Sequence, residues 1–145
     1  MPNDIFVDNN VAKNFCNPVD PNYKNFIKWL FEDGHLVVTN KILTEYVSST
    51  GGSISPTNIV IIIARLTRDG RLIKLSRQQL DEFVFNRRIE GVLRSNRKDH
   101  PHIKAVLLSN RKLALSLDDN FRYDLNNFPG HQAVARKRPE ELNYR

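Results

Sequence analysis

Four acidic residues stand at the ends of hydrophobic segments that lie far apart along the chain. They are Asp8, Glu45, Asp99 and Asp118. Asp8 and Asp118 directly follow short apolar runs, Glu45 follows another run by about one helical turn, and Asp99 precedes an apolar stretch. In α/β folds with parallel strands, residues at the carboxyl ends of the strands meet in one crevice. The pattern therefore favours a fold that gathers these side chains.

Short apolar runs alternate with amphipathic segments, which predicts alternating strands and helices. The expected strands are 5–8, 36–39, 72–75 and 113–117. The expected helices are 11–16, 23–31, 41–47, 57–69, 78–97 and 101–110, with a loop or short turn at 120–127. Strands that alternate with helices pair in parallel through right-handed crossovers. We therefore expect an α/β fold, a three-layer α/β/α sandwich with a central, mainly parallel sheet.

Local signals refine several of these helices. Asn40 is a favourable N-cap, and Ser55 followed by Pro56 is typical of a helix start. The run 59–63 is apolar around most of the helix circumference, so this helix should be well buried. The segment 78–97 is expected to form one long helix.

The length of 145 residues indicates one domain. We place it at residues 1–131, followed by a polar, basic and loosely ordered tail at 132–145. Cys16 is the only cysteine, so a reducing compartment, the cytoplasm, is expected. No apolar stretch reaches the roughly 18 residues of a transmembrane helix, so no membrane is expected as a partner.

The net charge of +6 is unevenly distributed. Residues 65–98 contain ten Lys/Arg and four Asp/Glu, whereas residues 1–60 contain four Lys/Arg and six Asp/Glu. A basic segment beside an acidic crevice suits a polyanion that approaches a metal site. The alternative is a solvated helix face. Carboxylates that repel one another need a cation, and oxygen ligands suit Mg²⁺ or Mn²⁺.

A resemblance to a known family follows from the residues around Asp118. The sequence Ser-Leu-Asp-Asp-Asn-Phe at 116–121 resembles the strand-end motif of PIN-domain nucleases. Residues 5–8, ending in Asp8, resemble the opening strand of that family with its first metal-binding aspartate. Thr39-Asn40 with Glu45, and then Asp99, resemble its second and third signatures, and the likeness covers roughly residues 4–128.

The resemblance implies a PIN-like fold and a metal-dependent endoribonuclease, either the toxin of a toxin–antitoxin pair or a stand-alone relative. Asp8, Asp99 and Asp118 would hold one or two Mg²⁺ or Mn²⁺ ions, and Glu45 would hold a second ion or orient the attacking water. Asn40, Ser116 and Asn120 would orient the carboxylates through hydrogen bonds. The residues expected to bind the RNA backbone are Arg65, Arg68, Arg87, Arg88, Arg94, Arg97 and Lys98. RNA is the expected partner; an antitoxin protein and a homodimer stay open.

Other interpretations remain. Each acidic residue also has a simpler role, as a turn residue, a helix cap or a surface charge. Asp119, Asp124, His100 and His102 are expected at the surface, the two histidines without a zinc ion. A catalytically weak PIN-like module that binds RNA or a protein is the second functional hypothesis, because Asn120 stands where many members carry an acid. A phosphatase or receiver domain is less well supported, because Asp8 is followed by Asn9 and Asn10 instead of a second acid.

Overall fold

The computed structural model describes residues 2–50 and 52–145 and has a central sheet of five parallel strands. The strands are β1 (Asp4–Val7), β2 (His35–Val38), β3 (Leu72–Lys74), β4 (Leu113–Leu115) and β5 (Val134–Arg136). Their order is β3-β2-β1-β4-β5, with every neighbouring pair parallel. The predicted α/β class, with a mainly parallel central sheet, is confirmed.

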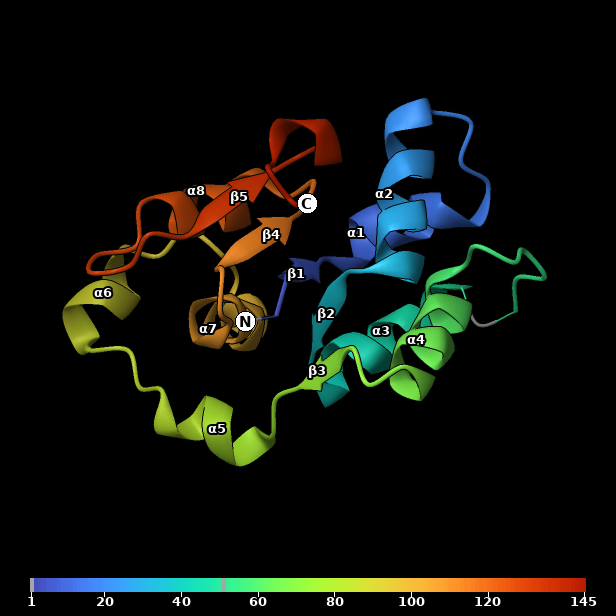
Figure 1. Ribbon diagram of the computed structural model, residues 1–145. Helices are drawn as coiled ribbons and strands as arrows, with labels where there is room; N and C mark the ends of the chain where they lie inside the picture. Colours follow the sequence, from blue (N-terminus) through green and yellow to red (C-terminus); the bar gives the residue numbers. More distant parts are fainter. Residues whose placement is uncertain (1, 51) are drawn as a thin grey trace.

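Helices cover both sides of this sheet, as in a three-layer α/β/α sandwich. They are α1 (Asn9–Ala12), α2 (Pro21–Glu32), α3 (Asn40–Thr50), α4 (Ile59–Arg68), α5 (Arg77–Glu82), α6 (Arg87–Val92), α7 (His100–Leu108) and α8 (Asp119–Asn126). Within residues 2–50 and 52–145, the 3₁₀ turns are η1 (Lys13–Cys16), η2 (Arg97–Asp99) and η3 (Pro139–Glu141). In Figure 1, α7 and α8 lie on one side of the strands and α1, α2 and α4 on the other.

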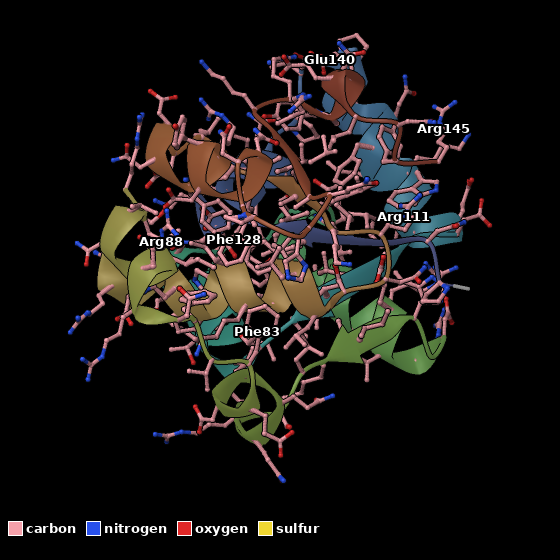
Figure 2. The ribbon with its side chains drawn as sticks, turned by 90° about the vertical axis from the view of Figure 1, so that its left-hand side faces the viewer. Phe83, Arg88, Arg111, Phe128, Glu140 and Arg145 are labelled. Carbon is pink, nitrogen blue, oxygen red and sulfur yellow. The ribbon has the colours of Figure 1, made fainter. Side chains whose placement is uncertain are left out.

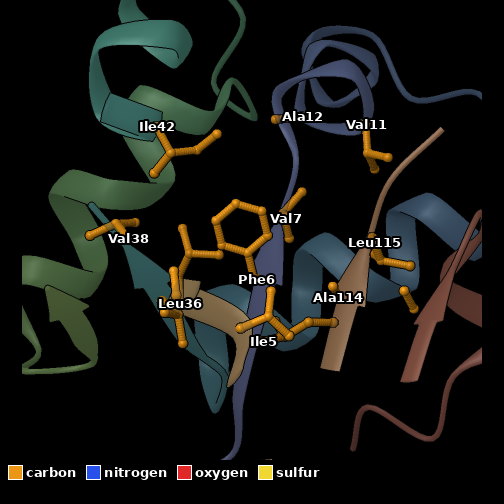
Figure 3. Packing of buried hydrophobic residues seen from close by; sticks show 14 of the residues in the cluster. Ile5, Phe6, Val7, Val11, Ala12, Leu36, Val38, Ile42, Ala114 and Leu115 are labelled. Atoms are coloured by element: carbon orange, nitrogen blue, oxygen red, sulfur yellow. The ribbon is translucent and has the colours of Figure 1, made fainter. Parts of the chain in front are cut away.

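The central strand β1 lies in the middle of the hydrophobic core. Ile5, Phe6 and Val7 are fully buried, as is usual for a parallel strand with helices on both faces. Figure 3 shows them between Leu36 of β2 and Leu115 of β4. Because the buried run ends at Val7, Asp8 is the first residue of this strand segment that reaches the open edge of the sheet.

The predicted long helix at 78–97 is wrong. The chain forms the short helices α5 and α6 there, and the 3₁₀ turn η2 begins at Arg97. Asn86 and Asn96 each act as an N-cap, a position with extended backbone that a continuous helix cannot contain. The chain between α5 and α6 also turns inward, so that the ring centroid of Phe85 lies 5.4 Å from that of Phe128, which is labelled in Figure 2. Tertiary aromatic packing therefore outweighs helical periodicity.

Three predictions about helix starts and burial are also corrected. Asn58, instead of Ser55, caps α4, because its side chain accepts hydrogen bonds from the amides of Val60 and Ile61. The helix α4 buries only one face, and Ile61 is 41% exposed. Likewise Thr39, and not Asn40, accepts the capping hydrogen bond at the start of α3, from the amide of Ile42.

The carboxyl-terminal quarter is more ordered than predicted. Residues 119–126 form α8, where a loop or short turn was expected, because Asp118 caps the helix. The segment 132–145 is not a loose tail: it contributes β5, pairs with β4 and buries Leu142 and Tyr144. The predicted boundary at residue 131 therefore does not separate a tail from the domain. In the described part of the chain, no helix is long and apolar enough to cross a membrane.

Candidate functional site

A cavity of about 610 Å³ opens at the carboxyl edge of the sheet. All four predicted acidic residues line it, namely Asp8, Glu45, Asp99 and Asp118. They come from four separate segments: the end of β1, α3, η2 and the end of β4. Four cations, Lys13, Lys41, Arg94 and Lys98, line the same cavity. The cavity thus combines carboxylates with positive side chains, and we call it the acidic cavity.

Asp8 is held in place by hydrogen bonds from three residues. Its carboxylate accepts from the amide of Asn9 at 2.8 Å, from the hydroxyl of Ser116 at 2.7 Å and from the carboxamide of Asn10 at 3.4 Å. Burial raises the pKa of Asp8 despite the opposing hydrogen bond from Ser116 and the charge of His102. A raised pKa means that the folded protein disfavours the charged carboxylate, so a cation bound nearby would relieve this cost.

Asp118 and Asp99 have free capacity for a ligand. One carboxylate oxygen of Asp118 accepts hydrogen bonds from the amides of Asn120 and Phe121 at 2.9 and 3.1 Å, and Asp118 thereby caps the start of α8. Its other oxygen has no hydrogen bond within the described residues. Asp99 precedes α7 as predicted, but its side chain makes no capping hydrogen bond. Capping therefore does not explain why Asp99 lies at this cavity.

Glu45 forms an unexpected pair with His102. The Nε2 atom of His102 lies 2.7 Å from a carboxylate oxygen of Glu45. Burial alone would raise the pKa of Glu45, but the hydrogen bond and charge of His102, with the charges of Lys41 and Lys98, lower it. The prediction of a surface histidine is wrong, because the His102 side chain is only 2% exposed and packs against Phe6 with ring centroids 5.4 Å apart.

Replacing His102 with leucine should raise the pKa of Glu45. Because the pKa of folded Glu45 is lowered, the pair stabilises the protein above the usual glutamate value of 4.5, and this contribution disappears as the pH falls through the lowered value. The parent should therefore be more stable than His102→Leu near neutral pH. In acid, the two proteins should have similar stability. Carboxyl NMR titration of Glu45 measures the first effect, and an unchanged titration would contradict the assigned hydrogen bond.

The three predicted orienting residues have different positions. Ser116 is buried and bonds Asp8, and Asn120 lines the acidic cavity. Asn40 is exposed and lines a neighbouring cavity instead. Sequence reasoning missed Asn10, whose carboxamide contacts Asp8 and whose oxygen accepts from the amide of Leu117 at 3.0 Å. The only sequence signal for Asn10 was its position two residues after Asp8.

Only some of the predicted RNA-binding residues lie at the acidic cavity. Arg94 and Lys98 line the acidic cavity, whereas Arg87 and Arg88 lie on α6, at the left edge of Figure 1. Of the others, Arg65 and Arg68 pair with Asp69 at the end of α4, and Arg97 pairs with Glu90. Lys13 and Lys41 line the cavity but lie outside the basic segment, so counting charge along the sequence missed them.

Asp124 fixes the segment that carries Arg94, Lys98 and Asp99. Its carboxylate accepts hydrogen bonds from the amide of Arg94 at 2.9 and 3.1 Å and from the amide of Ser95 at 2.7 Å. The guanidinium of Arg94 also lies 3.5 Å from the ring centroid of Tyr123. The prediction of a surface charge is therefore wrong for Asp124, which is 3% exposed.

The acidic residues share a cavity without forming a closed ligand set. Among the residues that the structure describes, no three His, Cys, Asp or Glu side chains lie close enough together to hold one metal ion. The carboxylate oxygens have the chemistry that Mg²⁺ and Mn²⁺ prefer. Asp99 and Asp118 are not buried, so their side chains have room to move toward Asp8 when a cation binds. A shared cation stays a prediction.

Comparisons with protein-family models, with curated proteins and with solved structures found no match. The function must therefore be argued from the residues of the acidic cavity themselves.

Proposed function

We propose that this protein is a metal-dependent endoribonuclease that hydrolyses phosphodiester bonds in RNA. The observation that carries the proposal is the convergence of Asp8, Glu45, Asp99 and Asp118 on one cavity that is also lined by cations. Carboxylates alone would repel a nucleic acid. Their combination with lysine and arginine side chains suits a site in which a cation and a phosphate bind together.

Asp8, Asp99 and Asp118 would hold Mg²⁺ or Mn²⁺, with Glu45 as a further ligand or as the residue that orients water. A bound cation of this kind polarises a phosphoryl oxygen and lowers the pKa of its water. Ser116 and Asn10 hold the Asp8 carboxylate in one orientation through their hydrogen bonds. Lys13, Lys41, Arg94 and Lys98 line the cavity where they could pair with phosphates on either side of the cleaved bond.

A role as the toxin of a toxin–antitoxin pair, with an antitoxin partner and a cytoplasmic location, belongs to the same proposal. It rests on the sequence resemblance to PIN-domain nucleases and on the single cysteine, Cys16. Sequencing the genes that adjoin the one for this protein would test it, because an antitoxin is expected as a small neighbouring gene.

The direct test is a cleavage assay on unstructured RNA. We expect purified protein to cut this RNA with Mg²⁺ or Mn²⁺ and to lose the activity in EDTA, because the carboxylates alone cannot activate water. Activity should return when the metal is restored in excess. Cleavage that continues unchanged in EDTA would exclude the proposed mechanism.

A second candidate is a module that binds RNA or a protein without cleaving RNA. Two observations favour it: no group of three potential ligands among the described residues is close enough for one ion, and Asn120 lines the cavity in place of another acid. This candidate predicts RNA binding or partner capture that does not depend on added metal. Calorimetric titration with Mn²⁺ separates the two, since only the nuclease requires a cation at Asp8.

A further inference from the structure

A second cavity of about 450 Å³ lies at the same edge of the sheet, between the ends of β2 and β3 and the start of α7. We propose that it binds one nucleotide of a single-stranded polynucleotide whose neighbouring phosphate lies in the acidic cavity. We call it the side cavity. The inference rests on the proposed nuclease function, and it names where the substrate continues beyond the acidic residues.

The two cavities are neighbours. Lys41, the second residue of α3, lines both of them. Pro101 of the side cavity follows Asp99 of the acidic cavity by two positions. An RNA strand with one phosphate beside Asp99 would therefore pass Lys41 and enter the side cavity directly.

The floor of the side cavity is apolar. Leu75, Leu80 and Pro101 contribute to it, and Leu75 is only 8% exposed. A nucleobase has a flat face that can pack against apolar side chains of this kind. The volume lies within the range of roughly 300–1,000 Å³ that is usual for ligand sites. The floor thus suits a base, whereas a site for phosphate alone would need no apolar surface.

The rim of the side cavity is positively charged. Lys41, Arg77 and Lys104 line it, against a single acid, Asp81, which lies 3.8 Å from the guanidinium of Arg77. None of the ion pairs between described residues involves Lys41 or Lys104. The ammonium group of Lys104 lies 5.3 Å from the ring centroid of Phe85, a weak contact that leaves its three N–H donors unpaired by any acid of the described residues. Two lysines are therefore available for phosphate oxygens on either side of a bound base.

The test measures binding without cleavage. A fluorescently labelled oligouridylate is titrated in EDTA with the parent protein, Lys104→Glu, Leu80→Gln and a control, Lys28→Glu. Lys28 is exposed on α2 and lines a different cavity, so its variant changes the net charge equally. We expect Lys104→Glu to weaken binding by roughly tenfold, as a repulsion replaces one ionic contact. Leu80→Gln should weaken it by about fivefold through lost apolar contact with the base, and Lys28→Glu should have little effect.

Circular dichroism shows whether each variant is folded. If Leu80→Gln is unfolded, the affinity of Lys104→Glu alone tests the side cavity. Equal weakening by Lys104→Glu and Lys28→Glu would mean non-specific attraction and would overturn the side cavity as a subsite. No effect of Lys104→Glu would overturn it as well, and so would the absence of binding by the parent both in EDTA and with Ca²⁺ in place of EDTA. A different outcome would contradict only the nuclease proposal. In that outcome the parent does not cleave RNA with Mg²⁺, while the parent and its variants bind the oligouridylate in EDTA with the expected order of affinities.

Discussion

Replacing Asp8 with asparagine should abolish RNA cleavage and leave the fold intact. Asp8 is central to the proposed site because its carboxylate is fixed by Ser116, Asn9 and Asn10 at the end of the central strand. Asparagine keeps the shape but removes the charge that a cation requires. Loss of residues that merely orient metal ligands typically costs about 10–100-fold. Loss of a ligand should therefore lower the rate by at least about 100-fold.

The same substitution should not lower stability. Burial raises the pKa of Asp8, so the folded state prefers the protonated form. The ionised carboxylate therefore costs stability above its folded pKa, and this cost is absent at pH values below the pKa of the unfolded chain. At neutral pH, Asp8→Asn should unfold at the temperature of the parent or above it. In acid, where Asp8 is protonated in both states, the two proteins should be equally stable.

The measurements are single-turnover cleavage with Mg²⁺ and thermal unfolding at neutral and acidic pH. Asp33→Asn is the matched control, because Asp33 is exposed at the end of α2 and lies away from the acidic cavity. It should cleave RNA as the parent does. If Asp8→Asn retains full activity, Asp8 binds no catalytic cation. If it unfolds well below the parent, its hydrogen bonds matter more to the fold than the buried charge does.

The sequence allowed the architecture and the acidic set to be predicted because both depend on local signals. Each buried strand of a parallel sheet is a short apolar run, and Asp8 and Asp118 are the first acidic residues after two such runs. Once the strands are parallel, their carboxyl ends share one edge. The gathering of Asp8 and Asp118 at one cavity therefore follows from the pattern of apolar runs.

The wrong predictions concern residues whose contacts join segments that are far apart in the sequence. The pair of His102 and Glu45 joins α7 to α3, and the hydrogen bonds from Arg94 and Ser95 to Asp124 join a loop to α8. Both contacts span tens of residues, so periodicity along either segment carries no sign of them. The strand β5 was missed for a related reason: three residues of mixed character become a strand only by pairing with β4.

Among residues outside the acidic cavity, we expect the replacement of Asp124 to have the largest effect on stability and on RNA cleavage. In Asp124→Ala, the part-buried amides of Arg94 and Ser95 lose their acceptor, and an unsatisfied donor costs about 1–3 kcal/mol when it is fully buried. We expect the free energy of unfolding to fall by about 2–3 kcal/mol. Because Arg94, Lys98 and Asp99 lie on the segment that Asp124 holds, cleavage should also fall. Small misplacements of reacting groups cost up to about 100-fold in rate.

Two further variants separate positioning by Asp124 from a general loss of charge on α8. Asp124→Asn keeps one carbonyl acceptor, so its stability and activity should lie between those of the parent and Asp124→Ala. Asp119→Ala removes a carboxylate that is 90% exposed on the same helix, and its ion pair with Arg122 should contribute less than about 1 kcal/mol. Urea unfolding and cleavage assays below the unfolding transition measure both effects. If Asp124→Ala lowers stability but cleaves RNA at the parent rate, the segment 94–99 does not contribute to the reaction, and the role of Asp99 as a metal ligand fails with it.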